Sequence, residues 1–537
     1  MTNLNPNSFW SYPYTSQRMP LIAENVVSTS QPLAASAGLR MLAKGGNAAD
    51  AALATAITLS VVEPCMNGIG GDAFALIWDG EKMHGLNASG RSPQSWTREH
   101  FSCYSEMPNR GWDSITVPGT VSAWRAVWER FGSLPFEDLF QPAIAYATHG
   151  FFVSNTVQRQ WAKQVKELKD QPGFLEAFTH NGSPPLPGER FICKGQALTL
   201  EKIAASKGDE FYKGTLAKQI ADYARLTGGL MTEDDLANHQ AEWIDPISIK
   251  YGDVELCEIG PNGQGIGALM ALGILDNFDM KNIEVSDPGL AAHLRIEAMK
   301  LAFADLHEYV ADIEYMKSVS VNDLIKTAYL ANRAKKIDLL KVSEFRPGNP
   351  YSGGTVYLTA ADSRGMMVSF IQSNFKGFGS GVVVPNTGIA LHNRGSGFSL
   401  RHGHPNEVMP NKRPFHTIIP AFLMKKGKPL MSFGVMGGSI QAQGHVQITG
   451  RIVDQGLNPQ AASDAPRWRI LDDNKTITVE WNMPQGVIDG LIARGHSVTK
   501  ASRLDLEFGS AQIAMKLENG AYCVASDHRK DGYPVGM

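Results

Sequence analysis

The chain has 537 residues, and its 50 Lys and Arg against 53 Asp and Glu give a formal net charge of −3. Because 43% of the residues are hydrophobic and 19% are charged, the composition is typical of a globular protein with a large core. The near balance of charge argues against a nucleic-acid partner and favours a small-molecule substrate.

The start of the chain carries no targeting pattern. Its first twenty residues are polar and aromatic, without a basic segment followed by an apolar run, so we expect no secretory signal and a cytoplasmic protein. Residues 51–62 form the most apolar stretch, which is far shorter than the about 20 apolar residues of a membrane span. No membrane partner is therefore expected.

Cysteines and histidines do not form a metal-binding pattern. The five cysteines are scattered without a CxxC pair, which indicates neither a disulfide framework nor a zinc site. His402 and His404 have no ligand-type neighbour before Glu407, so we interpret this segment as a polar surface loop. We expect no metal or organic cofactor.

The expected elements begin with a mixture of strands and helices. Residues 22–29 are predicted as a strand, residues 48–62 as an alanine-rich helix, and residues 73–79 as a strand ending in a hairpin turn. Helical periods then dominate up to about residue 340. The clearest of these lie at residues 121–131, 198–204 and 290–306.

The last third of the chain is rich in strands. Residues 356–361 and 367–372 are predicted as a hairpin, and further short strands follow. Helices and strands in separate blocks predict an α+β fold in which two packed sheets are covered by helices. The glycine-rich residues 260–267 fit neither common phosphate-binding motif, so we expect a tight packing loop there.

Thr355 follows Gly353 and Gly354 at the start of this hairpin. A threonine hydroxyl is a weak nucleophile unless a base takes its proton, and an N-terminal threonine carries such a base, an α-amine of pKa about 8. Cutting the bond between Gly354 and Thr355 would expose both groups on one residue. An ordinary loop that enters a strand explains the same local pattern, so the choice depends on the rest of the chain.

Several segments, in this order and spacing, resemble the γ-glutamyltransferase family, whose members are N-terminal nucleophile hydrolases made as self-cleaving precursors. The resemblance covers nearly the whole chain. Its segments are Ala37-Gly38-Leu39-Arg40, Asn47-Ala48-Ala49-Asp50-Ala51-Ala52, Val62-Glu63-Pro64, Gly68-Ile69-Gly70-Gly71, Gly90-Arg91-Ser92-Pro93, residues 355–362, Gly379-Ser380-Gly381, Lys412-Arg413-Pro414, Gly437-Gly438-Ser439 and Asp531-Gly532.

The resemblance implies a four-layer αββα sandwich made from one precursor chain. Residues 1–354 would form a large fragment, with helical layers and part of the sheets, and residues 355–537 a strand-rich small fragment. The two fragments would stay together as a heterodimer and form one globular unit, and a higher oligomer remains open.

The same resemblance assigns the catalytic residues. Gly354 and Thr355 match the cleavage site, and Thr355 is also the nucleophile. Ser373 matches a hydroxyl residue that hydrogen-bonds the nucleophile. Gly437 and Gly438 match the pair whose N–H groups form the oxyanion hole, and a plain turn is the alternative interpretation of that pair.

Four residues match substrate-binding positions. Arg91 matches an arginine that grips the substrate carboxylate in a bidentate manner, although a surface arginine beside a proline turn explains it too. His416 and Thr417 occupy the two positions where well-known members have serines that contact the same carboxylate. Asn374 is the candidate for an asparagine that the family has one position further on.

The departures from the family concern the substrate rather than the chemistry. Phe375 stands where the family has that asparagine, and no carboxylate lies near Gly397, where the family binds the α-amino group. The segment of residues 398–413 is short for the family's lid loop. We therefore expect self-cleavage and amide hydrolysis at an open pocket.

The leading hypothesis is an autoprocessing threonine amidohydrolase that acts on a γ-glutamyl or similar carboxylate-bearing amide, such as glutathione, with water as the main acceptor. One alternative is a related amidohydrolase or acylase that acts on oxamate or glutaryl amides. Another is an uncleaved, inactive binding protein of the same fold. A nucleotide-dependent enzyme is disfavoured because the sequence has no phosphate loop.

Overall fold

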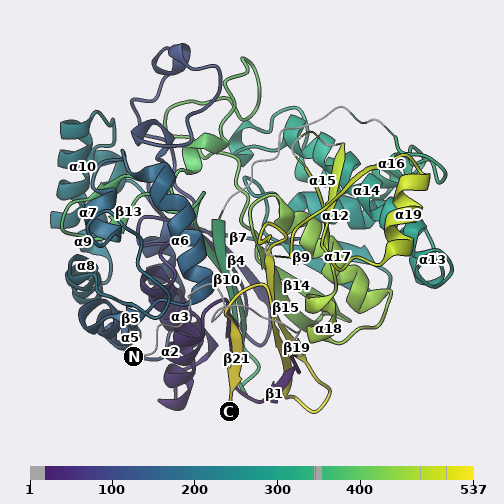
Figure 1. The fold of residues 1–537 in the computed structure, drawn as a ribbon, viewed down its shortest axis with the longest axis horizontal. Coiled ribbons are helices and arrows are strands. Elements are labelled where there is room, and N and C mark those ends of the chain that lie inside the picture. Colours follow the sequence, from purple (N-terminus) through teal and green to yellow (C-terminus); the bar gives the residue numbers. More distant parts are fainter. Residues whose placement is uncertain (1–17, 344, 346–353, 472, 474, 504) are drawn as a thin grey trace, which may run out of the picture.

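Two seven-stranded antiparallel sheets lie face to face between two layers of helices, as Figure 1 shows in a computed structural model that describes residues 18–343, 345, 354–471, 473, 475–503 and 505–537. This arrangement confirms the α+β sandwich expected from the sequence. The helices of residues 32–237 cover one sheet, and those of residues 265–334 and 440–493 cover the other.

The first sheet contains the strand that begins at the predicted nucleophile. Its order is β21 (Tyr533–Gly536), β2 (Val26–Thr29), β10 (Gly354–Ala361), β11 (Met367–Phe375), β3 (Asp72–Trp78), β4 (Met83–Asn87) and β7 (Glu242–Ile244). The second sheet has the order β1 (Leu21–Ala23), β20 (Tyr522–Ser526), β19 (Ser510–Lys516), β15 (Lys428–Met436), β14 (Ala421–Lys425), β9 (Val254–Glu258) and β8 (Ile247–Tyr251).

Three small sheets lie outside the sandwich. They are β12 (Val383–Val384) with β13 (Ile389–Ala390), β16 (Trp468–Ile470) with β17 (Thr476–Val479) and β18 (Ser497–Lys500), and β5 (Phe151–Phe152) with β6 (Arg190–Phe191).

The helices of the first layer all precede residue 240. They are α2 (Pro32–Ala43), α3 (Ala48–Val62), α4 (Thr120–Phe131), α5 (Phe136–His149), α6 (Asn155–Leu168), α7 (Phe174–Phe178), α8 (Lys194–Ala205), α9 (Asp209–Tyr212), α10 (Thr215–Thr227) and α11 (Glu233–Ala237). Short 3₁₀ turns occur at His100–Cys103, Trp112–Ser114, Ile313–Tyr315 and Arg394–Gly397.

The second helical layer comes from both halves of the chain. It contains α12 (Gly265–Leu275), α13 (Met280–Ser286), α14 (Pro288–Tyr309), α15 (Val321–Leu324), α16 (Thr327–Ala334), α17 (Ile440–Val453), α18 (Pro459–Asp464) and α19 (Gln485–Ala493). Among the described residues, no helix is both long and apolar enough to cross a membrane.

Helix α3 is buried on all sides and packs behind the nucleophile hairpin β10–β11. Its start is fixed by a capping box, in which the side chain of Asn47 accepts from the N–H of Asp50 and that of Asp50 accepts from the N–H of Asn47. Small residues let α2 and α3 approach closely, because a Cβ on Gly38 would lie 2.8 Å from the carbonyl oxygen of Ala51. The predicted helix at residues 48–62 is confirmed.

The expectation of one strand at residues 22–29 was wrong in one respect. Residues 21–23 form β1, which pairs with β20 in the second sheet, whereas residues 26–29 form β2, which pairs with β10 in the first. The chain crosses between the sheets at residues 24–25. An alternating pattern of side chains does not report this change of partner, since both strands have the same period.

Strands from the two sides of the predicted cleavage site pair with each other in both sheets. The pairs β21–β2, β2–β10, β11–β3, β1–β20 and β14–β9 each join a strand before residue 354 to one that lies in residues 354–537. After a cut between Gly354 and Thr355, these five strand pairs would therefore still join the two fragments by backbone hydrogen bonds.

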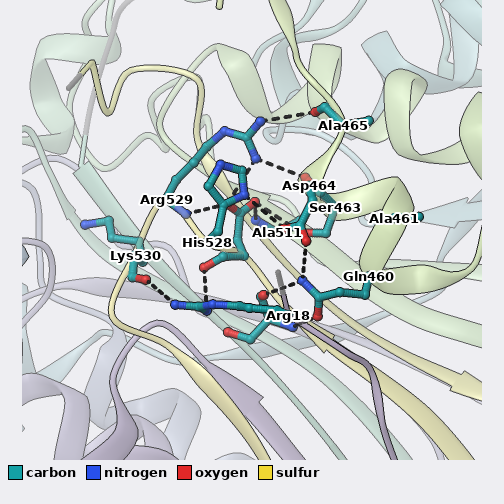
Figure 2. A network of polar contacts seen from close by, with 12 residues as sticks. Arg18, Gln460, Ala461, Ser463, Asp464, Ala465, Ala511, His528, Arg529 and Lys530 are labelled. Atoms are coloured by element: carbon teal, nitrogen blue, oxygen red, sulfur yellow. Dashed lines mark hydrogen bonds and ion pairs between the residues drawn. The ribbon is translucent and has the colours of Figure 1, made fainter. Parts of the chain in front are cut away.

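The C-terminal loop adds side-chain contacts across the same boundary (Figure 2). The guanidinium of Arg18 donates to the carbonyl oxygens of Asp527 at 3.2 Å and Gly532 at 2.7 Å. Ser154 and Thr156 each donate to the carboxylate of Asp531 at 2.6 Å. The terminal Asp-Gly motif thus fastens the end of the chain to its first half.

We predict that fragments produced by a cut between Gly354 and Thr355 remain one particle. Separating them would break the buried ladders of both sheets, so the fragments should co-elute in gel filtration without denaturant and separate only when unfolded. Two separate peaks in native buffer, at masses of the single fragments, would contradict this interpretation of the strand pairs.

Candidate active site

The hydroxyl of Thr355 is fully buried at the start of β10 and lies between one donor and one acceptor. Thr355 Oγ1 donates to Ser373 Oγ at 3.3 Å and accepts from Gln441 Nε2 at 3.3 Å. Gln441 is oriented by the N–H of Ile419, which donates to its Oε1 at 3.0 Å and leaves the amide nitrogen facing Thr355. Gly353, the first glycine of the predicted motif, lies outside the described residues.

Ser373 lies on β11, directly beside the strand that Thr355 begins. Its Oγ accepts from the N–H of Phe375 at 2.7 Å as well as from Thr355. Ser373 therefore occupies the place predicted for it, within hydrogen-bonding distance of the threonine hydroxyl. Its part in proton transfer stays a prediction.

Gly437 and Gly438 form the turn between β15 and α17. Their φ angles are +118° and +74°, in the region that favours glycine. The carbonyl oxygen of Gly438 accepts from Gln264 Nε2 at 2.9 Å and from the N–H of Gln441 at 3.1 Å. Within the described part of the chain, no backbone hydrogen bond is donated by either glycine N–H, and their part in an oxyanion hole stays a prediction.

The loop of residues 260–267 contributes to this turn. Its Gln264 donates to the carbonyl oxygens of both Thr417 and Gly438. A Cβ on Gly265 would lie 2.9 Å from the carbonyl oxygen of Ile259. The loop therefore packs tightly, as expected, and its Gln264 also holds the backbone at Thr417 and Gly438.

Asp72 is a fully buried carboxylate at the start of β3, paired in register with Ser373. It accepts from His416 Nε2 at 3.2 Å and from the N–H groups of Gly119 at 3.0 Å and Gly90 at 3.3 Å. Burial alone would raise the pKa of Asp72, but the neighbouring His392, His416 and Arg394 more than offset burial and hold it well below its usual range. Asp72 is therefore a permanent negative charge.

His416 is a neutral imidazole rather than a base. Burial and the nearby Arg394 lower its pKa to about 3, although Asp72 acts in the opposite direction. Its Nδ1 accepts from the N–H of Ile418 at 3.3 Å, so Nε2 carries the proton that is donated to Asp72. The structure thus places His416 against Asp72, and its predicted contact with a substrate carboxylate stays a prediction.

Arg394 is a buried cation that the sequence did not single out. It lies in the 3₁₀ turn Arg394–Gly397, donates from Nη1 to Thr417 Oγ1 at 2.8 Å, and stacks on Phe375 with 4.1 Å between Cζ and the ring centroid. Burial lowers its pKa to about 9 while Asp72 raises it, so the guanidinium stays charged at neutral pH. Its Nε and Nη2 have no partner among the residues that the structure describes.

Arg91, the predicted carboxylate-binding arginine, lies among protein carboxylates. Its guanidinium lies 3.1 Å from Asp312, 3.6 Å from Glu242 and 3.8 Å from Glu314. Arg413 shares Glu242 at 2.8 Å. The charge of Arg91 is therefore already balanced by protein carboxylates, and its contact with a substrate stays a prediction.

Asn374 is buried against the glycine segment of residues 68–71. A Cβ on Gly71 would lie 2.8 Å from Asn374 Oδ1 and 2.7 Å from the carbonyl oxygen of Ser373, which explains why glycine is needed there. In the described part of the chain, neither the oxygen nor the nitrogen of its carboxamide has a hydrogen-bond partner. An unsatisfied buried amide is suited to a ligand, and binding by Asn374 stays a prediction.

Two cavities border these elements. One, of about 550 Å³, is lined by Met436 and Gly437, at the turn between β15 and α17. The other, of about 470 Å³, is lined by Gly397 and Phe415, next to the Arg394 turn and Thr417. The turn at Gly437 and the turn at Arg394–Gly397 are thus each next to a cavity.

A separate buried cluster, His293, Glu297 and His496, has ligand atoms within 4.8 Å of one another. The rings of His293 and His496 are hydrogen-bonded at 2.8 Å and Lys300 lies 3.1 Å from Glu297, whereas His496 Nδ1 has no partner among the described residues. A lysine ammonium opposes a bound cation, so we interpret the cluster as a structural network.

Comparisons with known proteins show which family the chain resembles. The γ-glutamyltranspeptidase family profile matches residues 34–537. The glutathione hydrolase-like YwrD proenzyme of Bacillus subtilis is 37% identical, over 96% of this chain and 98% of the relative, and the oxamate amidohydrolase proenzyme of Klebsiella pneumoniae is 34% identical, over 94% and 97%. A cephalosporin acylase from Bacillus halodurans has a TM-score of 0.94 and 44% identity, with 98% of each chain covered.

These matches cover nearly the whole chain and include relatives described as proenzymes. They confirm the resemblance drawn from the sequence motifs and the sandwich that it implies. The chain belongs to the γ-glutamyltranspeptidase family of enzymes.

Proposed function

We propose that the chain is the precursor of an N-terminal threonine amidohydrolase, which cuts itself between Gly354 and Thr355 and then hydrolyses amides whose acyl group carries a carboxylate. The observation that carries this proposal is the buried hydroxyl of Thr355, directly after a glycine and between Gln441 Nε2 and Ser373 Oγ. Two relatives, one named as glutathione hydrolase-like and one as an oxamate amidohydrolase, support the substrate class.

Self-cleavage uses the hydroxyl of Thr355 on its own peptide bond. Thr355 Oγ1 attacks the carbonyl carbon of Gly354 while its proton passes by way of Ser373 to the leaving nitrogen, the C–N bond breaks, and the acyl group moves from nitrogen to oxygen. Water then hydrolyses the ester. The products are a carboxylate on Gly354 and a free hydroxyl and α-amine on Thr355.

Hydrolysis of the substrate repeats this attack on an external amide. The α-amine of Thr355 takes the hydroxyl proton as Oγ1 adds to the substrate carbonyl, and the protonated leaving amine departs to give an ester on Thr355. Water attacks the ester and releases the acid. The N–H groups of Gly437 and Gly438 stabilise the negative oxygen in both steps.

Thr355→Ala should abolish both self-cleavage and hydrolysis, because alanine supplies no nucleophile. Thr355→Ser should keep both at reduced rates, since serine has the hydroxyl and the α-amine but lacks the methyl group that restricts χ1. Gel analysis of ageing samples and release of amine from a substrate panel measure the two activities. A cleaved or active alanine variant would refute the mechanism.

Gly437→Ala should lower the hydrolysis rate by roughly 10²- to 10³-fold, as expected for loss of one oxyanion donor. At a φ of +118°, the new Cβ would lie 2.7 Å from Ile440 Cγ2, so the turn has to move. The rate constant for release of a chromogenic amine measures the effect.

Gly427→Ala is the matched control, because Gly427 has a φ of +74° in the turn between β14 and β15 with open space around it. It bears a similar backbone cost of about 1 kcal/mol and should keep the wild-type rate. Equal rates for both variants would mean that Gly437 has no catalytic part.

A further inference from the structure

We infer that Arg394 binds the distal carboxylate of the acyl group, and that its charge selects monoamides of simple dicarboxylic acids over γ-glutamyl amides, which carry an additional α-ammonium group. This inference rests on the proposed amidohydrolase function and specifies its substrate. In this inference Arg394 binds the substrate, whereas Thr355, Gly437 and Gly438 keep the catalytic roles proposed above.

The free edge of the Arg394 guanidinium has the geometry of a carboxylate site. Nη1 is already used by Thr417 Oγ1 at 2.8 Å, whereas Nε and Nη2 have no partner within the described residues. Nε and Nη2 are adjacent on one edge of the planar group. Two parallel N–H bonds from such an edge match the two oxygens of a carboxylate.

Arg394 makes no direct ion pair among the described residues. Asp72 acts on it through space, but no carboxylate oxygen occupies its Nε and Nη2 donors. The aromatic face of Phe375 offers a weaker cation–π contact at 4.1 Å. Because a fully buried cation with two unused donors is costly, an incoming carboxylate would be bound strongly.

Arg394 is connected to the reacting groups by short contacts. Phe375, on which the guanidinium stacks, donates its N–H to Ser373, and Ser373 accepts from Thr355. On the other side, Thr417 shares Gln264 with Gly438 of the oxyanion turn. A carboxylate on Arg394 would therefore anchor an acyl chain whose carbonyl reaches Thr355.

The same surroundings disfavour an ammonium group. Gly397 cannot be replaced by an acidic residue without rearrangement, since its Cβ would lie 2.5 Å from the carbonyl oxygen of Phe415. An α-ammonium near this turn would face the cation of Arg394, which is also the cation that acts on Asp72. The α-ammonium of a γ-glutamyl group is repelled by the guanidinium of Arg394, whereas a glutaryl group has no ammonium.

The first test compares three 4-nitroanilides on the self-cleaved wild-type protein: glutaryl, γ-glutamyl and pentanoyl. All share the leaving group, and they differ in the carboxylate and the ammonium. We expect kcat/KM for the glutaryl amide to exceed both others by about tenfold or more. A γ-glutamyl or pentanoyl amide that is hydrolysed as well as the glutaryl amide would overturn the inference.

The second test uses Arg394→Gln and Arg394→Lys. We expect Arg394→Gln to lower kcat/KM for the glutaryl amide roughly 10²-fold, mainly through KM, as for loss of one partner of a buried charge pair. The pentanoyl amide should change by less than about threefold, because it lacks the carboxylate. Lysine should rescue only in part, since it has the charge without the planar fork.

Arg225→Gln is the control variant, because Arg225 is 81% exposed on α10 and pairs only with Asp222 among the residues described. It should leave all three substrates unchanged. If Arg394 variants fail to fold, competitive inhibition of the wild type decides: glutarate should bind at least about tenfold more tightly than glutamate. Equal inhibition would contradict the inference.

Self-cleavage, read on the same samples, separates this inference from the proposed function. A protein that cleaves and hydrolyses amides without preferring the glutaryl group keeps the proposed function and refutes the role of Arg394. A protein that neither cleaves nor hydrolyses any of the three amides refutes both.

Discussion

The position of one buried hydroxyl governs the rest of this structure. Thr355 begins β10, which lies between β2 and β11 in the interior of a seven-stranded sheet. Helix α3 packs on one side of this hairpin, and on the other side Thr359 Oγ1 and Ser432 Oγ join the two sheets at 2.6 Å. The body of β10 therefore has little freedom, and Thr355, at a register shift near the start of the strand, is held by its hydrogen bonds to Gln441 and Ser373. Positioning of this kind is a large part of catalysis by an intramolecular nucleophile.

A second constraint is the buried charge beside this hairpin. Asp72 is held as a carboxylate by the neighbouring His392, His416 and Arg394, and His416 is held neutral by burial and by Arg394. Burial lowers the pKa of both His392 and His416, so both rings are neutral at neutral pH. In the proposed mechanism the α-amine of Thr355 would serve as the base, and Arg394 would bind the ligand.

Some of this could be predicted from the sequence. The helix at residues 48–62 was predictable because its capping residues, Asn47 and Asp50, are local. Thr355, Ser373 and the glycine pair were found because family motifs mark them. The split of residues 22–29 between two sheets was not predictable, since it depends on pairing with β20 and β10 far along the chain.

The environments of the two arginines could not be predicted for the same reason. Arg91 is surrounded by Asp312, Glu242 and Glu314, which are distant in sequence. The sequence shows only that Arg394 is a charged residue within a glycine-rich segment. Its proposed role in binding depends on its burial against Phe375 and Thr417, which the sequence does not show. Sequence motifs marked the candidate reacting groups, whereas the side-chain environment was needed to find the unused donors of Arg394.

The measurement that tests the central claim most directly is intact mass with N-terminal sequencing of purified, aged wild-type protein. The account predicts two fragments, residues 1–354 and 355–537, with a new N-terminus at Thr355. A single chain of 537 residues that stays intact, or a cut at any other bond, would contradict the claim that Thr355 is a nucleophile released by self-cleavage.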